Sequence, residues 1–291
     1  MLYRMPKFDY LAPKTLEEAL SLLSEYGGKA KVLAGGTDLL VTMKERKVTP
    51  AYLIGLANLT DLDYIRQENG DLRIGALATH QSITDSNLVK GSYGLLATAC
   101  GKVGTPQVRN MGTIGGNLCT ASPAADTVPS LIGLGAKAKI RSLKGERVVA
   151  VEEFFVAPGE SVIQTGEILT EIQIPNPPPH TLGVYLKLLP RTAIDMAAVG
   201  VAVVVTLDSK HTSFVDAKIV LGAVAPTPIR AHQAEDIIRG KAISDELIEK
   251  AAQAAANEAK PISDVRASAD YRKKMVRVLT NRALKQAIAS A

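Results

Sequence analysis

Apolar residues near the start of the chain recur at the three- and four-residue spacing of a helix. They are Leu16, Ala19, Leu20 and Leu23. Thr15 stands before them as an N-cap, and Glu18 follows three residues later, which is the capping-box pattern. Gly27 and Gly28 predict the helix end. Residues 30–36 then form a short apolar run that leads into two glycines, so we expect a strand–helix–strand start.

Two later stretches alternate between apolar and polar residues, as β-strands do. They cover residues 72–78 and 138–151. Residues 86–104 lie between them and predict one or two short helices interrupted by glycine.

A proline-rich segment divides the chain. Four prolines stand between residues 175 and 179, and such a segment continues neither a helix nor a sheet. We place a domain boundary there, with one domain at residues 1–176 and a second at residues 177–291. A chain of 291 residues suits two or three domains.

The C-terminal part predicts antiparallel strands followed by helices. Residues 199–207 and 214–224 are apolar runs separated by a turn-like segment, which is the pattern of adjacent antiparallel strands. Residues 244–259 and 268–288 predict helices, with Ser244 as the N-cap of the first.

Composition excludes several classes of protein. The 46% hydrophobic content is sufficient for packed cores and argues against a disordered scaffold. The net charge of +5 raises the question of nucleic-acid binding, but tryptophan is absent, aromatic residues make up 4%, and basic residues alternate with acidic ones. Cys100 and Cys119 are too few for a disulfide framework or an iron–sulfur cluster. With no signal-like N-terminal segment and no apolar run of about 20 residues, we expect a cytoplasmic protein.

Two glycine segments share one chemical pattern. Residues 34–38 read Ala-Gly-Gly-Thr-Asp after an apolar strand, and residues 112–117 read Gly-Thr-Ile-Gly-Gly-Asn, with Asp126 nine residues further on. Paired glycines let backbone N–H groups turn toward an anion with no Cβ in the way. Two such segments suit a dinucleotide pyrophosphate held from both sides. Asn117 can donate and accept, and Asp126 can accept from a ribose or ribityl hydroxyl. For residues 34–38 alone, a tight turn is the alternative.

Other nucleotide motifs do not apply. Residues 133–138 match the Rossmann fingerprint G-x-G-x-x-A, which requires a strand before it and a helix after it. Here the order is inverted, because a helical pattern precedes the match and a strand pattern follows it. No P-loop is present either, since Gly101 and Lys102 are followed by Val103.

Five segments together resemble the FAD-binding medium subunit of the molybdenum hydroxylases. That group includes xanthine dehydrogenase, carbon monoxide dehydrogenase and 4-hydroxybenzoyl-CoA reductase. The segments are VLAGGTDLL (32–40), TIGGNLCTASPAADTVPSL (113–131), GEILTEIQIP (166–175), YLKLLPRTAIDMAAVGVAV (185–203) and SADYRKKMVRVLTNRAL (268–284). The resemblance implies an α+β fold: a two-lobed FAD domain of the vanillyl-alcohol-oxidase type, then a C-terminal α/β domain with an antiparallel sheet.

The resemblance also implies a set of FAD contacts. They are Val32, Leu33, Ala34, Gly35, Gly36, Thr37, Asp38 and Leu39 in the first segment, Thr113, Ile114, Gly115, Gly116 and Asn117 in the second, and Val103, Asp126, Leu169 and Lys187 elsewhere. Ordinary core packing is the alternative for Val103 and Leu169. For Lys187, on an alternating strand, the alternative is a solvated face.

Several further residues carry two interpretations each. In the family the loop bracketed by Arg191 and Asp195 lies beside the flavin ring, and an exposed (i, i+4) pair is the alternative. Thr105, Pro106 and Arg109 precede the second glycine segment and are candidates for the flavin approach.

The remaining polar residues carry no predicted chemistry. We expect the histidines at surface or core-edge positions and not as metal ligands, because no two of them stand at metal-ligand spacing. They are His80, His180, His211 and His232. The basic residues of 268–288 predict a solvated face, or a docking surface for partner subunits.

The resemblance implies an oxidoreductase subunit that works in an electron relay. Electrons would pass from 2Fe-2S clusters of a small partner subunit through FAD to an external acceptor, with a molybdopterin cofactor on a large subunit, in a dimer of heterotrimers. Two cysteines do not suit the 4-hydroxybenzoyl-CoA reductase subtype, whose flavin subunit carries an additional cluster. The alternatives are a free-standing flavoenzyme of the enolpyruvyl-reductase type and a non-catalytic nucleotide-binding scaffold. The sequence names neither the hydroxylated substrate nor the acceptor.

Overall fold

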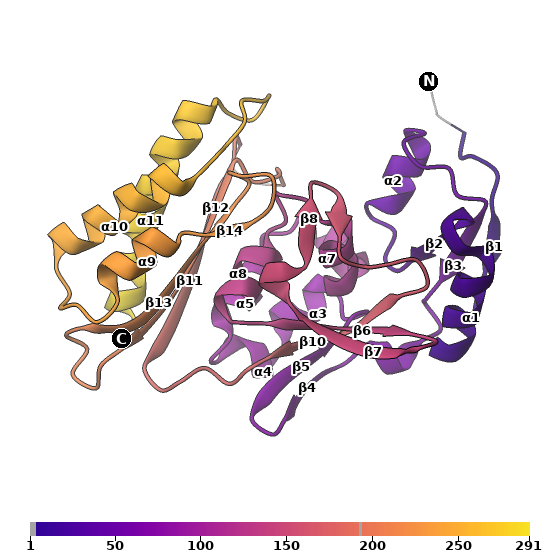
Figure 1. Cartoon of the computed structure of the whole chain (residues 1–291), viewed down its shortest axis with the longest axis horizontal. Helices are drawn as coiled ribbons and strands as arrows, with labels where there is room; N and C mark the ends of the chain where they lie inside the picture. Colours follow the sequence, from indigo (N-terminus) through magenta and orange to yellow (C-terminus); the bar gives the residue numbers. More distant parts are fainter. Residues whose placement is uncertain (1–3, 192–193) are drawn as a thin grey trace.

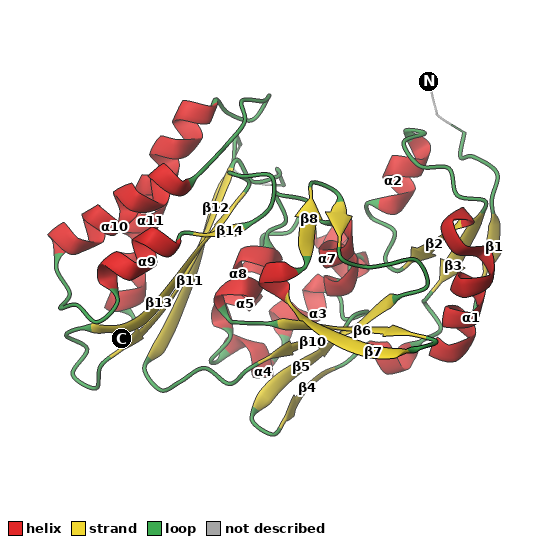
Figure 2. Cartoon of the chain, in the orientation of Figure 1, coloured by secondary structure: helices red, strands yellow, loops and turns green. Residues whose placement is uncertain are grey.

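The computed structural model describes residues 4–191 and 194–291. Figure 1 shows three regions side by side, with the N-terminal lobe at one end and the C-terminal helices at the other. A sheet of at least three strands forms the basis of each region (Figure 2). The architecture is therefore α+β, as predicted, with its parts in the order of the sequence.

The N-terminal lobe is a parallel sheet with two helices. Its strands, in spatial order, are β1 (Asp9–Leu11), β3 (Tyr52–Gly55) and β2 (Ala30–Leu33), and its helices are α1 (Leu16–Tyr26) and α2 (Leu39–Lys44). The predicted helix start is confirmed, because Thr15 Oγ1 accepts from Glu18 N at 3.1 Å. The second bond of the predicted capping box, from the Thr15 N–H to the Glu18 carboxylate, is not formed. The Glu18 carboxylate accepts from Lys14 N instead.

The middle region is an antiparallel sheet covered by short helices. In spatial order its strands are β4 (Ile65–Glu68), β5 (Asp71–Gly75), β10 (Ile168–Ile174), β6 (Lys137–Ser142) and β7 (Gly145–Ala150). The helices are α3 (His80–Asp85), α4 (Asn87–Lys90), α5 (Gly94–Gly101), α6 (Pro106–Met111), α7 (Ile114–Thr120) and α8 (Thr127–Gly133). A small hairpin of β8 (Phe155–Ala157) and β9 (Glu160–Ser161) follows. Because β10 inserts between β5 and β6, segments nearly 100 residues apart become neighbours.

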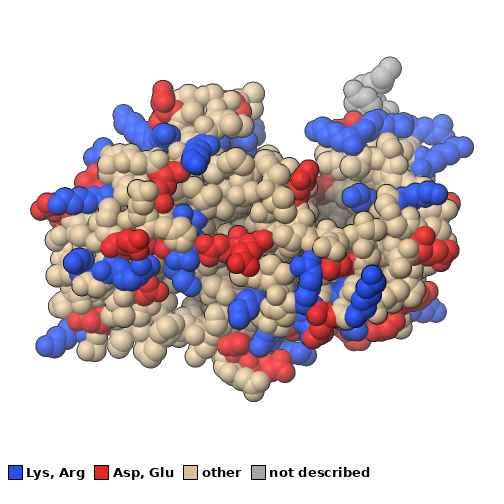
Figure 3. Space-filling model, in the orientation of Figure 1, with Lys and Arg blue, Asp and Glu red and all other residues tan. Residues whose placement is uncertain are grey.

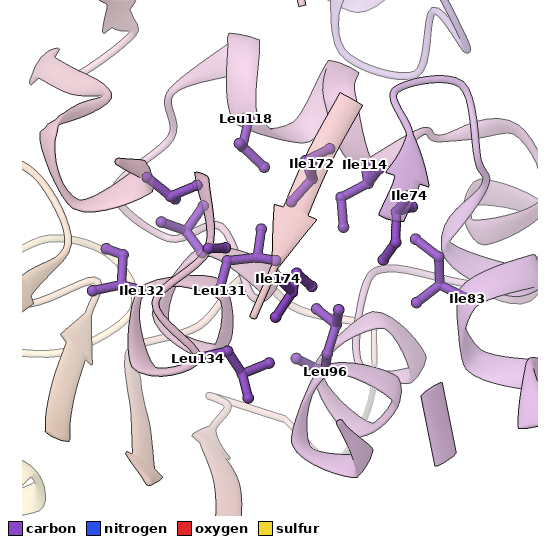
Figure 4. Close-up of a cluster of buried hydrophobic side chains, with 14 of the residues drawn as sticks. Ile74, Ile83, Leu96, Ile114, Leu118, Leu131, Ile132, Leu134, Ile172 and Ile174 are labelled. Carbon is purple, nitrogen blue, oxygen red and sulfur yellow. The ribbon is translucent and has the colours of Figure 1, made fainter. Parts of the chain in front are cut away.

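The middle core lies where this sheet meets its helices. Ile74 and Ile172 from the sheet pack with Leu96, Ile114 and Leu131 from the helices, and all are buried (Figure 4). Ile114 is thus a core residue of α7, and its burial holds the second glycine segment against the sheet.

The C-terminal region is a four-stranded antiparallel sheet with three helices. Its strands are β11 (Thr181–Leu188), β12 (Val199–Leu207), β13 (Phe214–Gly222) and β14 (Ile229–Arg230), and its helices are α9 (His232–Ile238), α10 (Asp245–Glu258) and α11 (Ala269–Ala289). The helices lie on one face, and α5 and α8 of the middle region lie on the other (Figure 1).

Burial on both faces explains the continuous apolar run of β12. Ala202 and Val204 belong to the middle core, whereas Val201, Val203 and Val205 belong to the C-terminal core. A strand covered on both faces reads as unbroken apolar sequence because neither face meets water. The predicted pairing of residues 199–207 with the next apolar run is confirmed as the antiparallel β12–β13 pair.

One basic residue of α11 is buried, which contradicts a wholly solvated basic face. Arg272 is 1% exposed and donates to the carbonyl oxygens of Ala198 at 3.2 Å and Ala223 at 2.8 Å. It also pairs with Asp264. Arg272 therefore ties α11 to the loops that flank β12 and β13.

Surface charge is mixed on the face seen in Figure 3, where basic and acidic side chains are interspersed. Blue side chains gather on the lobe that carries α2, which ends at Lys44 and is followed by exposed Arg46 and Lys47. In the part of the chain that the structure describes, no helix is both long and apolar enough to cross a membrane.

Candidate functional site

A cavity of about 1050 Å³ opens where the N-terminal lobe meets the middle region. Its wall includes the whole first glycine segment, residues 32–39, and parts of the second, at Thr113 and residues 115–117. Val103, Asp126 and Leu169 also line it. Of the predicted site residues, Ile114 and Lys187 do not line the cavity, since Ile114 is in the core and Lys187 lies behind Asp126.

The first glycine segment presents unused backbone donors to this cavity. Within residues 4–191 and 194–291, the N–H groups of Gly35, Gly36, Thr37 and Asp38 have no hydrogen-bond acceptor. Gly36 has a φ of +73°, a left-handed conformation that glycine adopts without strain. Consecutive free N–H groups in such a loop form an anion-binding concavity. The segment is therefore more than a tight turn.

Gly35 is required for a different reason, namely contact with the second segment. A Cβ built on Gly35 would lie 1.8 Å from the carbonyl oxygen of Met111, far inside van der Waals contact. The Cα of Gly35 thus packs directly on the backbone just before Gly112. This contact joins the two glycine segments.

Most of the second segment belongs to the helix α7, and the backbone N–H groups of residues 114–117 already have acceptors. Thr113 is the N-cap of α7 and accepts from Gly116 N at 3.0 Å, while Asn117 N donates to the Thr113 carbonyl at 3.0 Å. Ile114 N donates to Ala78 O and Gly115 N to Ala76 O, each at 3.0 Å. The prediction that both segments offer free N–H groups to an anion is wrong for this one. The local reason is the strong Thr113 cap, which starts a helix where a loop was expected.

Gly115 allows α7 to lie close to the turn after β5. A Cβ on Gly115 would lie 2.7 Å from both the Cβ and the oxygen of Ala76. Gly115 therefore permits this close packing, and it also lines the cavity.

Asp126 is held by two side chains from the C-terminal region. It is 6% exposed, and it accepts from Tyr185 Oη at 2.8 Å and from Lys187 Nζ at 2.7 Å. Burial raises the pKa of Asp126, and Lys187 and Tyr185 offset part of that rise. A carboxylate has about four acceptor positions, so Asp126 keeps capacity for a hydroxyl in the cavity.

Lys187 is not on a solvated face, which was the alternative interpretation. Its side chain is 2% exposed, and its ammonium also donates to the Lys102 carbonyl at 3.0 Å. Sequence reasoning missed Tyr185. The only signal was its position two residues before Lys187, which places both on the same face of β11.

The candidates before the second segment have structural partners. Thr105 is the N-cap of α6, where it accepts from Val108 N at 3.3 Å, and Pro106 occupies the first turn. Arg109 donates to Val103 O at 3.1 Å and to Gln81 Oε1 at 3.2 Å. Thr105, Pro106 and Arg109 do not line the cavity, whereas their neighbours Gly104 and Val108 do.

The loop between β11 and β12 reaches the cavity. Arg191 and Asp195 form a two-point ion pair, with Arg191 Nε 2.9 Å from Asp195 Oδ1, although no helix contains them. The bond from Arg191 lowers the pKa of Asp195. Ile194, Asp195 and Met196 line the cavity, and residues 192–193 of this loop lie outside the described residues. The pair is exposed at Arg191 and faces the cavity at Asp195, and a place beside the flavin ring stays a prediction.

The predicted surface positions are confirmed for His180, His211 and His232 but not for His80. His80 is 2% exposed and lines the cavity. His180 and His211 lie together, with ring nitrogens 3.1 Å apart, because the strand start of β11 meets the β12–β13 turn. Among the described residues, no group of three potential metal-ligating side chains occurs.

A turn on the far side of the cavity was not predicted to take part. Residues 159–161 and 163–168 line the cavity after β8. Arg147 holds this turn in place by donating to both carboxylate oxygens of Glu167 at 2.8 Å and to Val162 O at 2.7 Å. The hydrogen bond from Arg147 lowers the pKa of Glu167.

Comparison with known proteins identifies the class of fold and site. The family described as "FAD binding domain in molybdopterin dehydrogenase" matches residues 6–177, and "CO dehydrogenase flavoprotein C-terminal domain" matches residues 184–287. The carbon monoxide dehydrogenase medium chain of Afipia carboxidovorans is 36% identical over 98% of both chains. The xanthine dehydrogenase FAD-binding subunit of Escherichia coli is 30% identical over 97% of both.

Solved structures agree with these sequence matches. The carbon monoxide dehydrogenase from Hydrogenophaga pseudoflava superposes with a TM-score of 0.95 at 36% identity, covering 98% of this chain and 99% of the other. Quinoline 2-oxidoreductase from Pseudomonas putida 86 gives a TM-score of 0.93 at 30% identity, covering 99% of each. The chain belongs to the FAD-binding medium subunits of the molybdenum hydroxylase family, of the carbon monoxide dehydrogenase and xanthine dehydrogenase type. It is therefore an oxidoreductase flavoprotein subunit.

Proposed function

We propose that this chain holds FAD in the cavity between its N-terminal lobe and middle region and serves as the electron-transfer subunit of a molybdenum hydroxylase complex. In this proposal electrons pass from 2Fe-2S clusters of a partner subunit through FAD to an external acceptor. FAD supplies the ability to exchange electrons singly or in pairs, which suits a junction between one-electron clusters and a two-electron acceptor.

The observation that carries the proposal is the row of free N–H groups at Gly35, Gly36, Thr37 and Asp38 on the wall of the cavity. They can bind a pyrophosphate without any basic side chain. The volume of about 1050 Å³ lies just above the roughly 300–1,000 Å³ typical of small-ligand sites, which supports a ligand as large as a dinucleotide. The other cofactor residues proposed from the resemblance line the same cavity, except Ile114 and Lys187.

The second segment has a different part in the proposal. The N–H groups of residues 114–117 are used inside the protein, so Gly116 lets the ligand pack against helix backbone that carries no side chain at this position. Asn117 and Asp126 provide polar side chains at the same wall. Asn117 Oδ1 accepts from Thr127 Oγ1 at 2.5 Å. This bond fixes the orientation of the amide and leaves its nitrogen as a donor for the ligand.

Partner subunits follow from the same proposal. We infer a small subunit with 2Fe-2S clusters and a large subunit with the molybdopterin cofactor, assembled as a dimer of heterotrimers. The domain limits at residues 1–176 and 177–291 and a cytoplasmic location stay predictions. A free-standing flavoenzyme of the enolpyruvyl-reductase type remains the alternative, and turnover by this chain alone would favour it.

The first experiment measures cofactor binding. The purified full chain should show a flavin absorption spectrum with one FAD per chain, and Gly36→Val should lose it, because Gly36 needs a left-handed φ and its Cβ would meet Leu33 and Leu40 at 3.1 Å. The matched control is Gly28→Ala, which lines the same cavity but has no atom within 4 Å of the added Cβ. A colourless wild-type protein would favour the scaffold alternative.

The second experiment tests the relay. The chain alone should fail to oxidise purines, aldehydes or aromatic acyl thioesters, and activity should appear only with the cluster-bearing and molybdopterin-bearing subunits. Substrate turnover by the purified chain with no other polypeptide present would contradict the proposal.

A further inference from the structure

His80 lies in the cavity wall where the two glycine segments meet. Its backbone N–H donates to the Gly112 carbonyl at 3.0 Å, and what remains accessible of the residue, 2%, lines the cavity. A Cβ built on Gly112 would lie 3.3 Å from His80 Cδ2 and 3.3 Å from Thr37 Oγ1. The imidazole is therefore a close neighbour of the segment that carries the free N–H groups.

The surroundings of the ring indicate which nitrogen carries the proton. His80 Nδ1 is fully enclosed and has no hydrogen-bond partner within the described ranges 4–191 and 194–291. An orphaned buried N–H is rarer in proteins than an acceptor left unfilled. The tautomer with its proton on Nε2 leaves only a lone pair unfilled at Nδ1. Nε2–H is then the ring's donor, next to the Cδ2 edge that adjoins Gly112.

The ring is neutral in the absence of a ligand. Burial lowers the pKa of His80 to about 4, and the nearby Arg109 guanidinium contributes to the shift. Arg109 itself is held by Val103 O at 3.1 Å and by Gln81. A neutral imidazole has one donor and one acceptor, so His80 offers a single hydrogen bond without a buried charge.

We propose that His80 contacts the cofactor and donates Nε2–H to the diphosphate of bound FAD, beside the N–H groups of residues 35–38. This inference rests on the proposed function, because it assumes the dinucleotide in this cavity. The free N–H groups locate the anion, and the imidazole next to them adds one further donor. Such a contact would also offset part of the cost of burying this imidazole, whose Nδ1 has no hydrogen-bond partner within residues 4–191 and 194–291.

The test uses the full chain freed of FAD, with FAD and ADP as probes, since ADP carries the diphosphate without the flavin. His80→Phe keeps a planar ring and removes the donor, whereas His80→Gln keeps a donor. The control is His232→Gln, whose side chain is 61% exposed and which does not line the cavity. We expect His80→Phe to weaken both FAD and ADP by about tenfold to a hundredfold, as for one hydrogen bond to a charged group. His80→Gln should lose less affinity for FAD and ADP than His80→Phe, and the control variant should lose none.

The possible outcomes separate this inference from the proposed function. Unchanged FAD affinity in His80→Phe would overturn the role of His80, and so would a loss of FAD affinity with ADP affinity kept. Wild-type protein that binds no FAD would instead overturn the proposed function. If His80→Phe does not fold, imidazole ¹⁵N spectra of the wild-type FAD complex decide: a proton on Nε2 whose signal moves on FAD addition supports the contact, and a proton on Nδ1 overturns it.

Discussion

Lys187 on β11 forms a buried ion pair with Asp126 at the start of α8, with 2.7 Å between Nζ and Oδ2. The two residues are 61 positions apart and join the C-terminal sheet to the wall of the cavity. Tyr185 completes the arrangement through the other carboxylate oxygen. Side chains of the C-terminal region therefore hold Asp126 in its place in the cavity wall, although Lys187 itself does not line the cavity.

Replacing Lys187 should destabilise the chain. Lys187→Met leaves Asp126 buried without its counter-ion, and removal of one partner of a buried pair costs about 3–5 kcal/mol. We expect the free energy of unfolding, measured by urea denaturation at pH 7, to fall by that amount. Lys273→Met, at an exposed position of α11, is the control and should change little. A Lys187→Met protein as stable as wild type would mean that the pair contributes nothing.

A methyl group at Gly35 should force the two glycine segments apart. Gly35→Ala places Cβ 1.8 Å from the Met111 carbonyl oxygen, and overpacking of this kind costs about 1–3 kcal/mol. We expect lower thermal stability and weaker FAD binding together, by differential scanning fluorimetry and fluorescence titration. Gly28→Ala, with open space around the new Cβ, should keep both. Equal behaviour of the two variants would show that contact with Met111 is not what requires glycine at position 35.

Stability should depend on pH through Asp264. Hydrogen bonds from Arg266, and further from Arg272, hold the pKa of Asp264 well below its usual range. Because the folded-state pKa is lowered, this carboxylate stabilises the protein fully above its unfolded pKa of about 3.9, and the contribution is lost as pH falls toward the lowered value. Asp264→Asn should therefore cost roughly 1.5–3 kcal/mol at pH 7 and progressively less below about pH 4. Urea titrations at several pH values measure this, with exposed Asp61→Asn as the control; a difference that does not vary with pH would contradict it.

FAD should be bound without a covalent link. Neither glycine segment contains a histidine, cysteine or tyrosine, but His80 and Cys119 do line the cavity. Cys119 is exposed, and no basic side chain among the described residues lowers the pKa of its thiol, so it is mostly protonated at neutral pH. Acid precipitation should release all flavin into the supernatant. Flavin that stays in the pellet of wild type and leaves it in Cys119→Ser would show a cysteinyl link.

Local patterns in the sequence predicted several of the longer helices and strands, because these patterns depend on neighbours only a few residues apart. The apolar spacing after Thr15, the alternation over residues 138–151 and the apolar run at 199–207 each appear as the expected element. The two glycine segments could be recognised for the same reason. A glycine pair permits left-handed backbone conformations and close approach of a ligand wherever it lies in the fold.

Only the tertiary structure decided how those residues are used. The N–H groups of Ile114 and Gly115 are occupied because Ala78 and Ala76, which follow β5, lie against α7, whereas those of residues 35–38 have no acceptor among the described residues. Lys187 is buried because β11 packs against the middle region, and periodicity alone could not separate that from a solvated face. His80 reaches the cavity only because Gly112 and Thr37 come together around it. The sequence by itself determined the elements and the family; burial and hydrogen-bond partners depend on contacts between residues far apart in the chain, and those exist only once the three sheets have packed.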